Sequence, residues 1–362
     1  MFSFLTVFGD DSEDESLYSQ ADRDHLRTFT PNRSFDWRGN ALEDPARIDT
    51  WREELQGIIN GIDNIANGAF VSSADINPSR SPWTMDFEKP VHQLIASIAR
   101  EDAAGASWDS LLTNGAQRAY LIRGVITKCL ESSIFCEPLY GAHAGLLKTI
   151  REQNPQPQDQ GPFEQAQVRA EQCLEYVRKY GAETQNFWVK TDEISQVIIT
   201  MLFPLYNLIE KHATGAKRPQ SRAQFHQDLH TVVAASGWLS ISMRVHAGIM
   251  RWKWPRPGDT CDWTQVNADQ SMWKASETHR MAMLDMVSVE SLATAKVKIV
   301  VTPEISYNTL GTVSHREIRR SEILSKPTVV YYAGDAGFGR QLVQDNGVSL
   351  AEHVRQVRGR AG

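Results

Sequence analysis

The sequence predicts a mainly α-helical protein: a bundle-like domain of many helices, with a small antiparallel β element near its C-terminus. Apolar residues recur at helical spacing through most of the chain between residues 45 and 292. β-branched residues that alternate with polar ones come together only after residue 293. The composition, 41% hydrophobic and 23% charged over 362 residues, is that of a globular protein with ample chain for a large core.

An acidic segment, residues 1–44, precedes the first predicted helix. Residues 10–16 read DDSEDES, and the first 50 residues hold eleven acidic side chains against five Lys or Arg. The net charge of −6 therefore belongs to this end, and the rest of the chain is neutral. Such a segment buries little apolar surface, so we expect it to be partly disordered and otherwise to lie along the surface. Three aromatic residues can anchor it there: Phe29, Phe35 and Trp37.

Four helices are predicted before a central linker. The first begins at Pro45, a residue that suits the first turn of a helix, and it places Ile48, Trp51 and Leu55 on one apolar face. The other three follow the same helical spacing of apolar residues. The four ranges are 45–66, 90–104, 108–131 and 139–152.

The linker, residues 153–163, reads QNPQPQDQGPF. It cannot continue a helix, because it holds three prolines and four glutamines with little apolar content. Apolar helices flank it on both sides, so we expect it to join two layers of one helical domain, residues 45–292. Helices are predicted after it at 164–180 and 186–212. Pro204 lies inside the second of these and should kink it by removing a backbone hydrogen bond.

The chain is organised around residues 222–254, which we expect to form one long helix followed by a tryptophan-rich exit, with the helix ending before Pro255. Six residues recur at steps of three and four and therefore share one face: Phe225, Leu229, Val232, Ser236, Leu239 and Met243. Ser221 suits the N-cap position. The small residues at 234–237 predict that a second helix crosses closely there, with Trp238 filling the space beside the crossing.

The pattern changes towards the C-terminus, after a further helix predicted at 265–292. Residues 296–301 and 328–332 carry alternating and β-branched side chains, and both ranges predict strands. We expect the two strands to pair. Because a two-stranded sheet alone is barely stable, residues 293–362 should pack on the helical domain.

Three shorter features complete this region. A short strand is predicted near Tyr307. Residues 334–339, GDAGFG, lack the spacing of a phosphate-binding loop, and we interpret them as a turn. A last helix is predicted at 349–358, where Ser349 and Glu352 have the spacing of a capping box.

Two histidines on the central helix, His226 and His230, raise the question of a metal site. Residues four apart share a helix face, which suits two ligands of one metal ion. However, Gln227 stands where the metalloprotease signature has its glutamate, and the nearby sequence offers no obvious third ligand. We therefore predict no metal and no cofactor, with these two histidines as the residues to test first.

Basic and aromatic residues alternate after the central helix, at Arg251, Trp252, Lys253, Trp254 and Arg256. Grooves that stack nucleic-acid bases and attract phosphates show this pattern. A loop that packs its indoles on the core and leaves its charges in water shows it too, and we expect such a loop. Together with Trp238 and Arg244, these five residues are the candidate binding residues.

Four stretches carry a resemblance: AASGWLSISMR at 234–244, WPRPGDTCDW at 254–263, KVKIVVTPEI at 296–305 and KPTVVYYAG at 326–334. They resemble a broad group of uncharacterised proteins of filamentous fungi. The resemblance covers roughly the C-terminal third. It implies a fungal source, but this group has no activity to carry over and therefore supplies no site residues.

The sequence favours an intracellular protein, cytoplasmic or nuclear. Its four cysteines include no C-x-x-C pair and predict free thiols. The N-terminus lacks the basic region of a signal peptide. The longest apolar stretch, residues 197–209, is too short to span a bilayer, so no membrane association is expected.

No catalytic constellation emerges, so we expect a non-enzymatic interaction protein, a scaffold or adaptor with a protein partner. Two alternatives stay open. One is a small-ligand-binding protein or enzyme with a pocket beside residues 222–254, where His226, Asp228, His230 and Arg244 are the polar candidates. The other is a nucleic-acid or chromatin-associated protein that uses residues 251–256, although the neutral charge of the body counts against it.

Overall fold

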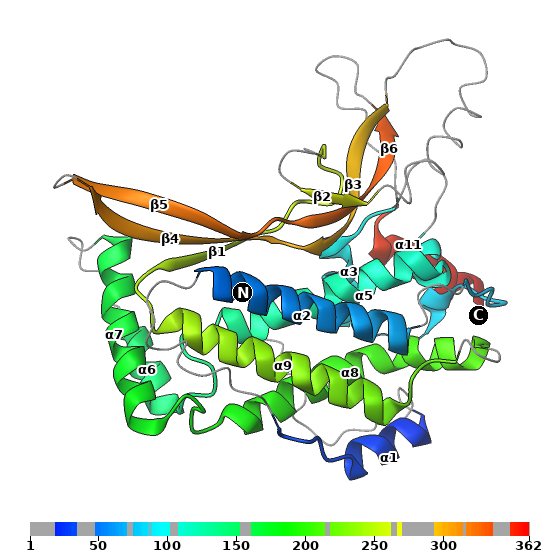
Figure 1. Cartoon of the computed structure of the whole chain (residues 1–362). Helices are drawn as coiled ribbons and strands as arrows, with labels where there is room; N and C mark the ends of the chain where they lie inside the picture. Colours follow the sequence, from blue (N-terminus) through cyan, green and yellow to red (C-terminus); the bar gives the residue numbers. More distant parts are fainter. Residues whose placement is uncertain are drawn as a thin grey trace.

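The computed structural model is mainly α-helical, with small β-sheets built from strands of the C-terminal region (Figure 1). It describes residues 19–34, 48–70, 75–85, 87, 89–101, 108–152, 161–213, 218–261, 266–269, 293–313, 316–335 and 348–361. The predicted fold class is thus confirmed. Several features predicted from the sequence lie outside these ranges: the acidic run at 10–16, Phe35, Trp37, most of the linker and most of residues 265–292.

The helices are α1 (Gln20–Thr28), α2 (Ile48–Ala69), α3 (Lys89–Ile98), α4 (Ser110–Thr113), α5 (Gly115–Leu130), α6 (Ala144–Glu152), α7 (Pro162–Tyr180), α8 (Phe187–His212), α9 (Arg222–Arg244) and α11 (Leu350–Ala361). From α2 onward they follow the predicted order with shifted ends, whereas α1 corrects the expectation of disorder for residues 1–44: its capping box and its buried Asp22 order residues 20–28. Short turns occur as η2 (Pro82–Thr84) and as the π-helical turn η3 (Glu131–Phe135). The helix predicted at 108–131 is divided at Asn114, whose side chain accepts a hydrogen bond from the Gln117 amide and so starts α5. Helix α8 continues through Pro204.

The central helix α9 begins as predicted, since Ser221 Oγ accepts from the Gln224 amide at 3.2 Å. Its predicted end is wrong. The helix stops at Arg244, ten residues before Trp254, and the chain then enters strand β1 (Ile249–Lys253). The reason is tertiary: β1 pairs antiparallel with β4 (Glu304–Val313), and this ladder satisfies the backbone groups that a longer helix would have bonded internally.

A second helix was predicted to cross α9 closely at residues 234–237, but the structure places a side chain beside Gly237. Gly237 faces the ring of Tyr140, so an aromatic side chain fills the space beside the small residues. The close contact between helices occurs at Gly61 on α2, where an added Cβ would lie 2.7 Å from Val232 Cγ2 on α9. Trp238 is buried in the same core.

The strands form two three-stranded sheets. In the first, β1, β4 and β5 (Arg316–Ser325) pair antiparallel in the order β1-β4-β5. In the second, β6 (Thr328–Asp335) lies between β3 (Ala293–Thr302), which is antiparallel to it, and β2 (Asn267–Asp269), which is parallel.

The predicted pairing of 296–301 with 328–332 is confirmed, with Lys296 opposite Tyr332 and Val300 opposite Val329. The two strands are not a simple hairpin, because β4 and β5 lie between them in sequence and belong to the other sheet. Pro303 stands where the chain passes from β3 to β4; it has no amide hydrogen to donate to a ladder. Residues 267–269, predicted as helix, are strand β2.

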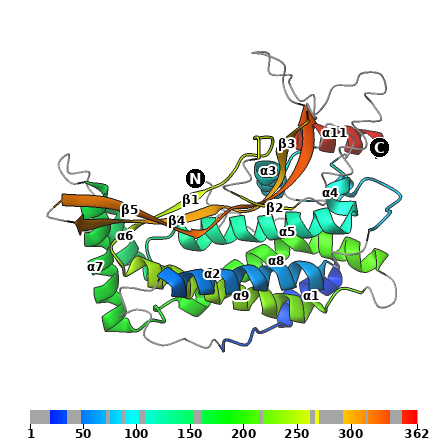
Figure 2. The same cartoon turned by 45° about the horizontal axis from the view of Figure 1, so that its top comes forward.

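The sheets cover one side of α2 and α5, while α8 and α9 lie beyond α2 (Figures 1 and 2). Gly124 on α5 permits close packing against the sheet, because a Cβ there would lie 2.6 Å from the Val300 carbonyl oxygen on β3. One apolar core joins residues of α2, α5, α8 and α9 to residues of β3, β4 and β6. In the part of the chain that is described, no helix is both long and apolar enough to cross a bilayer.

Candidate functional site

The structure separates the two histidines of the predicted metal motif. His226 Nδ1 lies 3.1 Å from His25 Nε2 on α1, whereas His230 Nε2 lies 2.9 Å from Asp192 Oδ1 on α8. Each histidine therefore has a different partner on a different helix. Within the described ranges, no group of three or more His, Cys, Asp or Glu side chains is placed to hold a metal ion.

His226 is the more deeply buried member of the pair with His25. Burial lowers the pKa of His226 to about 4, and the neighbouring His25 and His230 add to this effect. Its Nε2 is buried without a hydrogen-bond partner among the described residues. The ring of Phe29 covers it at a centroid distance of 4.7 Å. Phe29 is thus an anchor, as predicted, and the imidazole of His226 is held neutral at pH 7.

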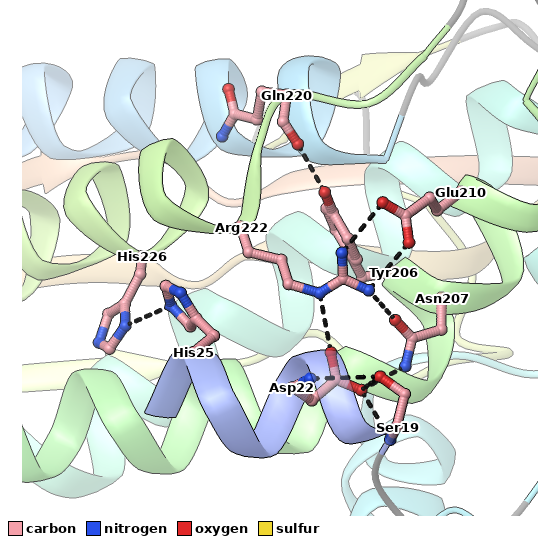
Figure 3. A network of polar contacts seen from close by, with 9 residues as sticks. All are labelled: Ser19, Asp22, His25, Tyr206, Asn207, Glu210, Gln220, Arg222 and His226. Atoms are coloured by element: carbon pink, nitrogen blue, oxygen red, sulfur yellow. Dashed lines mark hydrogen bonds and ion pairs between the residues drawn. The ribbon is translucent and has the colours of Figure 1, made fainter. Parts of the chain in front are cut away.

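A second polar cluster surrounds Asp22, the fully buried carboxylate of α1 (Figure 3). Its Oδ1 accepts from Arg222 Nε at 2.9 Å, and its Oδ2 accepts from Asn207 Nδ2 at 2.6 Å. Oδ2 also accepts from the amide and the hydroxyl of Ser19. The backbone amide of Asp22 donates back to Ser19 Oγ, and this bond together with the one from the Ser19 amide forms the capping box that starts α1. Arg222 in turn donates to both carboxylate oxygens of Glu210, at 3.0 and 2.8 Å.

The chain that follows α1 is held to the same helices. The Asn32 amide donates to Gln227 Oε1 at 2.8 Å, and Gln227 Nε2 donates back to the Asn32 carbonyl oxygen at 3.1 Å. Arg33 Nη2 lies 2.5 Å from Asp192 Oδ2, the same carboxylate that binds His230. We call residues 19–34 the N-terminal strap. The sequence suggested that this segment lies along the surface, but not which residues receive it, because its partners are some 160 to 200 positions away.

Three of the predicted binding residues meet at the turn η3. Arg244 Nη2 donates to the Phe135 carbonyl oxygen at 2.5 Å. The indole of Trp252 lies 4.6 Å from the Phe135 ring, and Trp254 Nε1 donates to Glu131 Oε2 at 2.7 Å. Both indoles are thus half-buried and in contact with the protein itself.

The basic side chains of residues 251–256 are exposed to solvent, unlike the two indoles. Arg251, Lys253 and Arg256 are exposed, and the first two lie on alternate positions of β1, on the face opposite Trp252. Residues 249–253, expected as helix or loop, are therefore a strand whose two faces divide the aromatic from the basic side chains. The structure does not bring these basic side chains and the indoles into one groove.

Three pockets in the described part of the chain hold about 160, 180 and 240 Å³. Pockets that enclose a drug-sized ligand usually measure about 300–1,000 Å³. The pocket of 180 Å³ lies at the C-terminal end of α9 and includes Arg244 among its lining residues. These three spaces suit a small ion or fragment and not a bulky cofactor.

Comparisons of this chain with protein-family models, with curated proteins and with solved structures found no match.

Proposed function

We propose that this chain is a non-enzymatic protein-interaction protein, and that the N-terminal strap covers its partner-binding surface on α8 and α9. The observation that carries the proposal is the way in which the strap is attached. Its contacts with α8 and α9 include a series of hydrogen bonds and ion pairs, made by the side chains of Asp22, His25 and Arg33 and by the backbone of Asn32.

Polar contacts of this kind suit a displaceable segment. A neutral hydrogen bond within a protein contributes only about 0.5–1.5 kcal/mol net, because water replaces the partner when the bond opens, and a bond to a charged group contributes about 1.5–3 kcal/mol. The buried Asp22–Arg222 pair is therefore the contact whose loss releases the strap. The helices beneath the strap are held by the continuous apolar core instead. Release of residues 19–34 would therefore leave α8 and α9 folded while it exposes their polar groups.

The uncovered surface also defines the chemistry of a partner. It would present the guanidinium of Arg222 beside Asn207, and the imidazole of His226 beside Gln227. The strap meets these groups with a carboxylate on a short helix and an aromatic ring two turns later. A protein partner that offers a short helix with the same acidic and aromatic residues would fit the same surface.

The test is a comparison of three full-length chains: the wild type, Asp22→Asn and the matched control Asp24→Asn. Asp24 lies on the exposed side of the same helix, so the control removes the same charge without touching Arg222. Hydrogen exchange of the α1 amides first verifies that only Asp22→Asn releases the strap. Affinity capture from cell extract, with quantitative mass spectrometry, should then show at least one protein enriched on Asp22→Asn alone. Identical protein sets on all three chains, with the strap released, would reject the proposal.

We further propose that the chain acts in the cytoplasm or nucleus. The support is that Cys129, Cys136, Cys173 and Cys261 are all free thiols, as expected in a reducing compartment. Fluorescence microscopy of the tagged chain in its source cells tests this, and a secreted or luminal signal would contradict it.

A further inference from the structure

The described residues that line the pocket at the C-terminal end of α9 include two arginines and no carboxylate. We call it the α9-end pocket; it has a volume of about 180 Å³. Arg244 reaches it from α9 and Arg169 from α7, and Figure 1 shows α6 and α7 beside the point where α9 gives way to β1. The other lining residues that matter here are Cys136, Cys173, Met243 and His246.

No ion pair joins either arginine to an acidic side chain among the described residues, although the charge of Glu137 acts on Arg244. Arg244 donates to the Phe135 carbonyl oxygen, and Arg169 Nε donates to the Gln165 carbonyl oxygen of its own helix at 3.2 Å. A guanidinium has five N–H donors, and these two bonds each use one of them. Burial is the main influence on the pKa of Arg244 and lowers it; the charge of the neighbouring Arg169 also lowers it, whereas Cys173, Cys136 and Glu137 raise it.

The other titratable groups in the pocket do not neutralise these charges. Burial raises the pKa of both thiols, that of Cys173 to about 11, so Cys136 and Cys173 are uncharged at pH 7. Burial lowers the pKa of His246, which keeps its imidazole neutral. Glu137 is the nearby acid that acts on Arg244, and it does not line the pocket. The two arginines are therefore not neutralised by any described residue that lines the pocket.

We propose that the α9-end pocket binds a small organic oxyanion, whose phosphate or carboxylate oxygens accept hydrogen bonds from Arg169 and Arg244. Planar guanidinium groups match such oxygens with two parallel hydrogen bonds, and bound charge of opposite sign removes the penalty of holding two cations in a partly dry space. The remaining lining is apolar, with Ile150, Met243 and Met250, and it suits a small hydrocarbon body attached to the anionic group. This site is independent of the surface beneath the strap.

The test is isothermal titration calorimetry of the full-length chain with phenyl phosphate, with benzoate, and with phenol as the neutral analogue. We expect at least one of the anions to bind, phenol to bind at least about tenfold more weakly, and inorganic phosphate to compete. Equal binding of phenol, the absence of binding by both anions at millimolar concentration, or a failure of phosphate to compete would overturn the proposal.

Variants of Arg169 assign the binding to this pocket. Arg169→Gln should weaken binding of the anion about tenfold or more, and Arg169→Lys should restore part of it by returning the charge. Arg169 is preferred to Arg244 because its replacement removes only one hydrogen bond within α7, so the fold is retained. Arg178→Gln is the matched control, since Arg178 is an exposed residue of the same helix. An equal loss in Arg178→Gln would show that overall charge, and not the pocket, attracts the anion.

Discussion

Replacing Asp22 by Asn should undock the N-terminal strap while the rest of the protein stays folded. The Asn amide keeps the shape of the carboxylate but places an N–H group where Oδ1 meets Arg222 or where Oδ2 meets Asn207, so one donor faces another. The guanidinium of Arg222 also loses one of its two acidic partners and keeps Glu210.

The magnitude follows from the burial of the pair. Breaking a fully buried ion pair costs about 3–5 kcal/mol. Arg222 is 18% exposed and retains Glu210, so we expect about 2–4 kcal/mol for Asp22→Asn. Because the strap lies at the edge of the core, this free energy belongs to the docking of α1 and not to global unfolding.

Hydrogen exchange measured by mass spectrometry reads this docking directly. A loss of 2–4 kcal/mol corresponds to a fall of about 30-fold to 1,000-fold in the protection of the α1 amides, limited by their exchange rate in the free segment. Protection in α5 and α9 should not change. Full protection of α1 in Asp22→Asn, or an equal loss in Asp24→Asn, would refute the role given to the buried carboxylate.

Three further predictions test other parts of the structure. The folded-state pKa of His226 is lowered to about 4 from 6.5, so the neutral imidazole stabilises the docked strap above pH 6.5, and this stabilisation is lost as the pH falls towards 4. Protection of the α1 amides against hydrogen exchange should therefore fall across this pH window. The variant His226→Gln should show a weaker dependence of this protection on pH. In α2, Gly61→Ala should lower the free energy of unfolding in urea by about 1–3 kcal/mol, because the added Cβ would crowd Val232 on α9. The control Gly57→Ala, whose Cβ would have no atom within 4 Å, should raise it by up to about 1 kcal/mol. Equal effects of the two variants would contradict the close contact at Gly61. Ser221→Ala should cost about 1 kcal/mol in the same assay, and an unchanged midpoint would mean that the N-cap bond to α9 contributes nothing.

Only part of the candidate site could be predicted from the sequence. Spacing identified His226 and His230 as neighbours on one helix face, and both are on α9. It did not identify Asp22, Asn207 or His25, because nothing in the local sequence marks a single polar residue as buried. Ser19 and Asp22 have the spacing of a capping box, a local signal that could have predicted the start of α1.

The conformation of residues 251–256 could not be predicted from their local pattern either. Alternating basic and aromatic side chains are equally compatible with a loop, a stacking groove and a strand, because all three tolerate that pattern. Pairing with β4 makes Ile249–Lys253 a strand, because the backbone of β4 bonds to it, and the preceding helix ends at Arg244. The indoles then lie against η3, and Arg244 reaches the α9-end pocket.

The sequence by itself determined the fold class, the order of the helices from α2 to α9, the N-cap at Ser221 and the pairing of two C-terminal strands. The helices, the strands and the cap rest on periodicity or capping between residues that are close along the chain, where side-chain direction follows from backbone geometry alone. The pairing follows because two strands need each other as partners. Tertiary structure alone decided where α9 ends, which histidine meets which partner, and which arginines share a pocket. These outcomes depend on contacts between residues far apart in sequence, such as Asp22 with Arg222 and Ile249 with Asn308, and local energies do not encode such contacts.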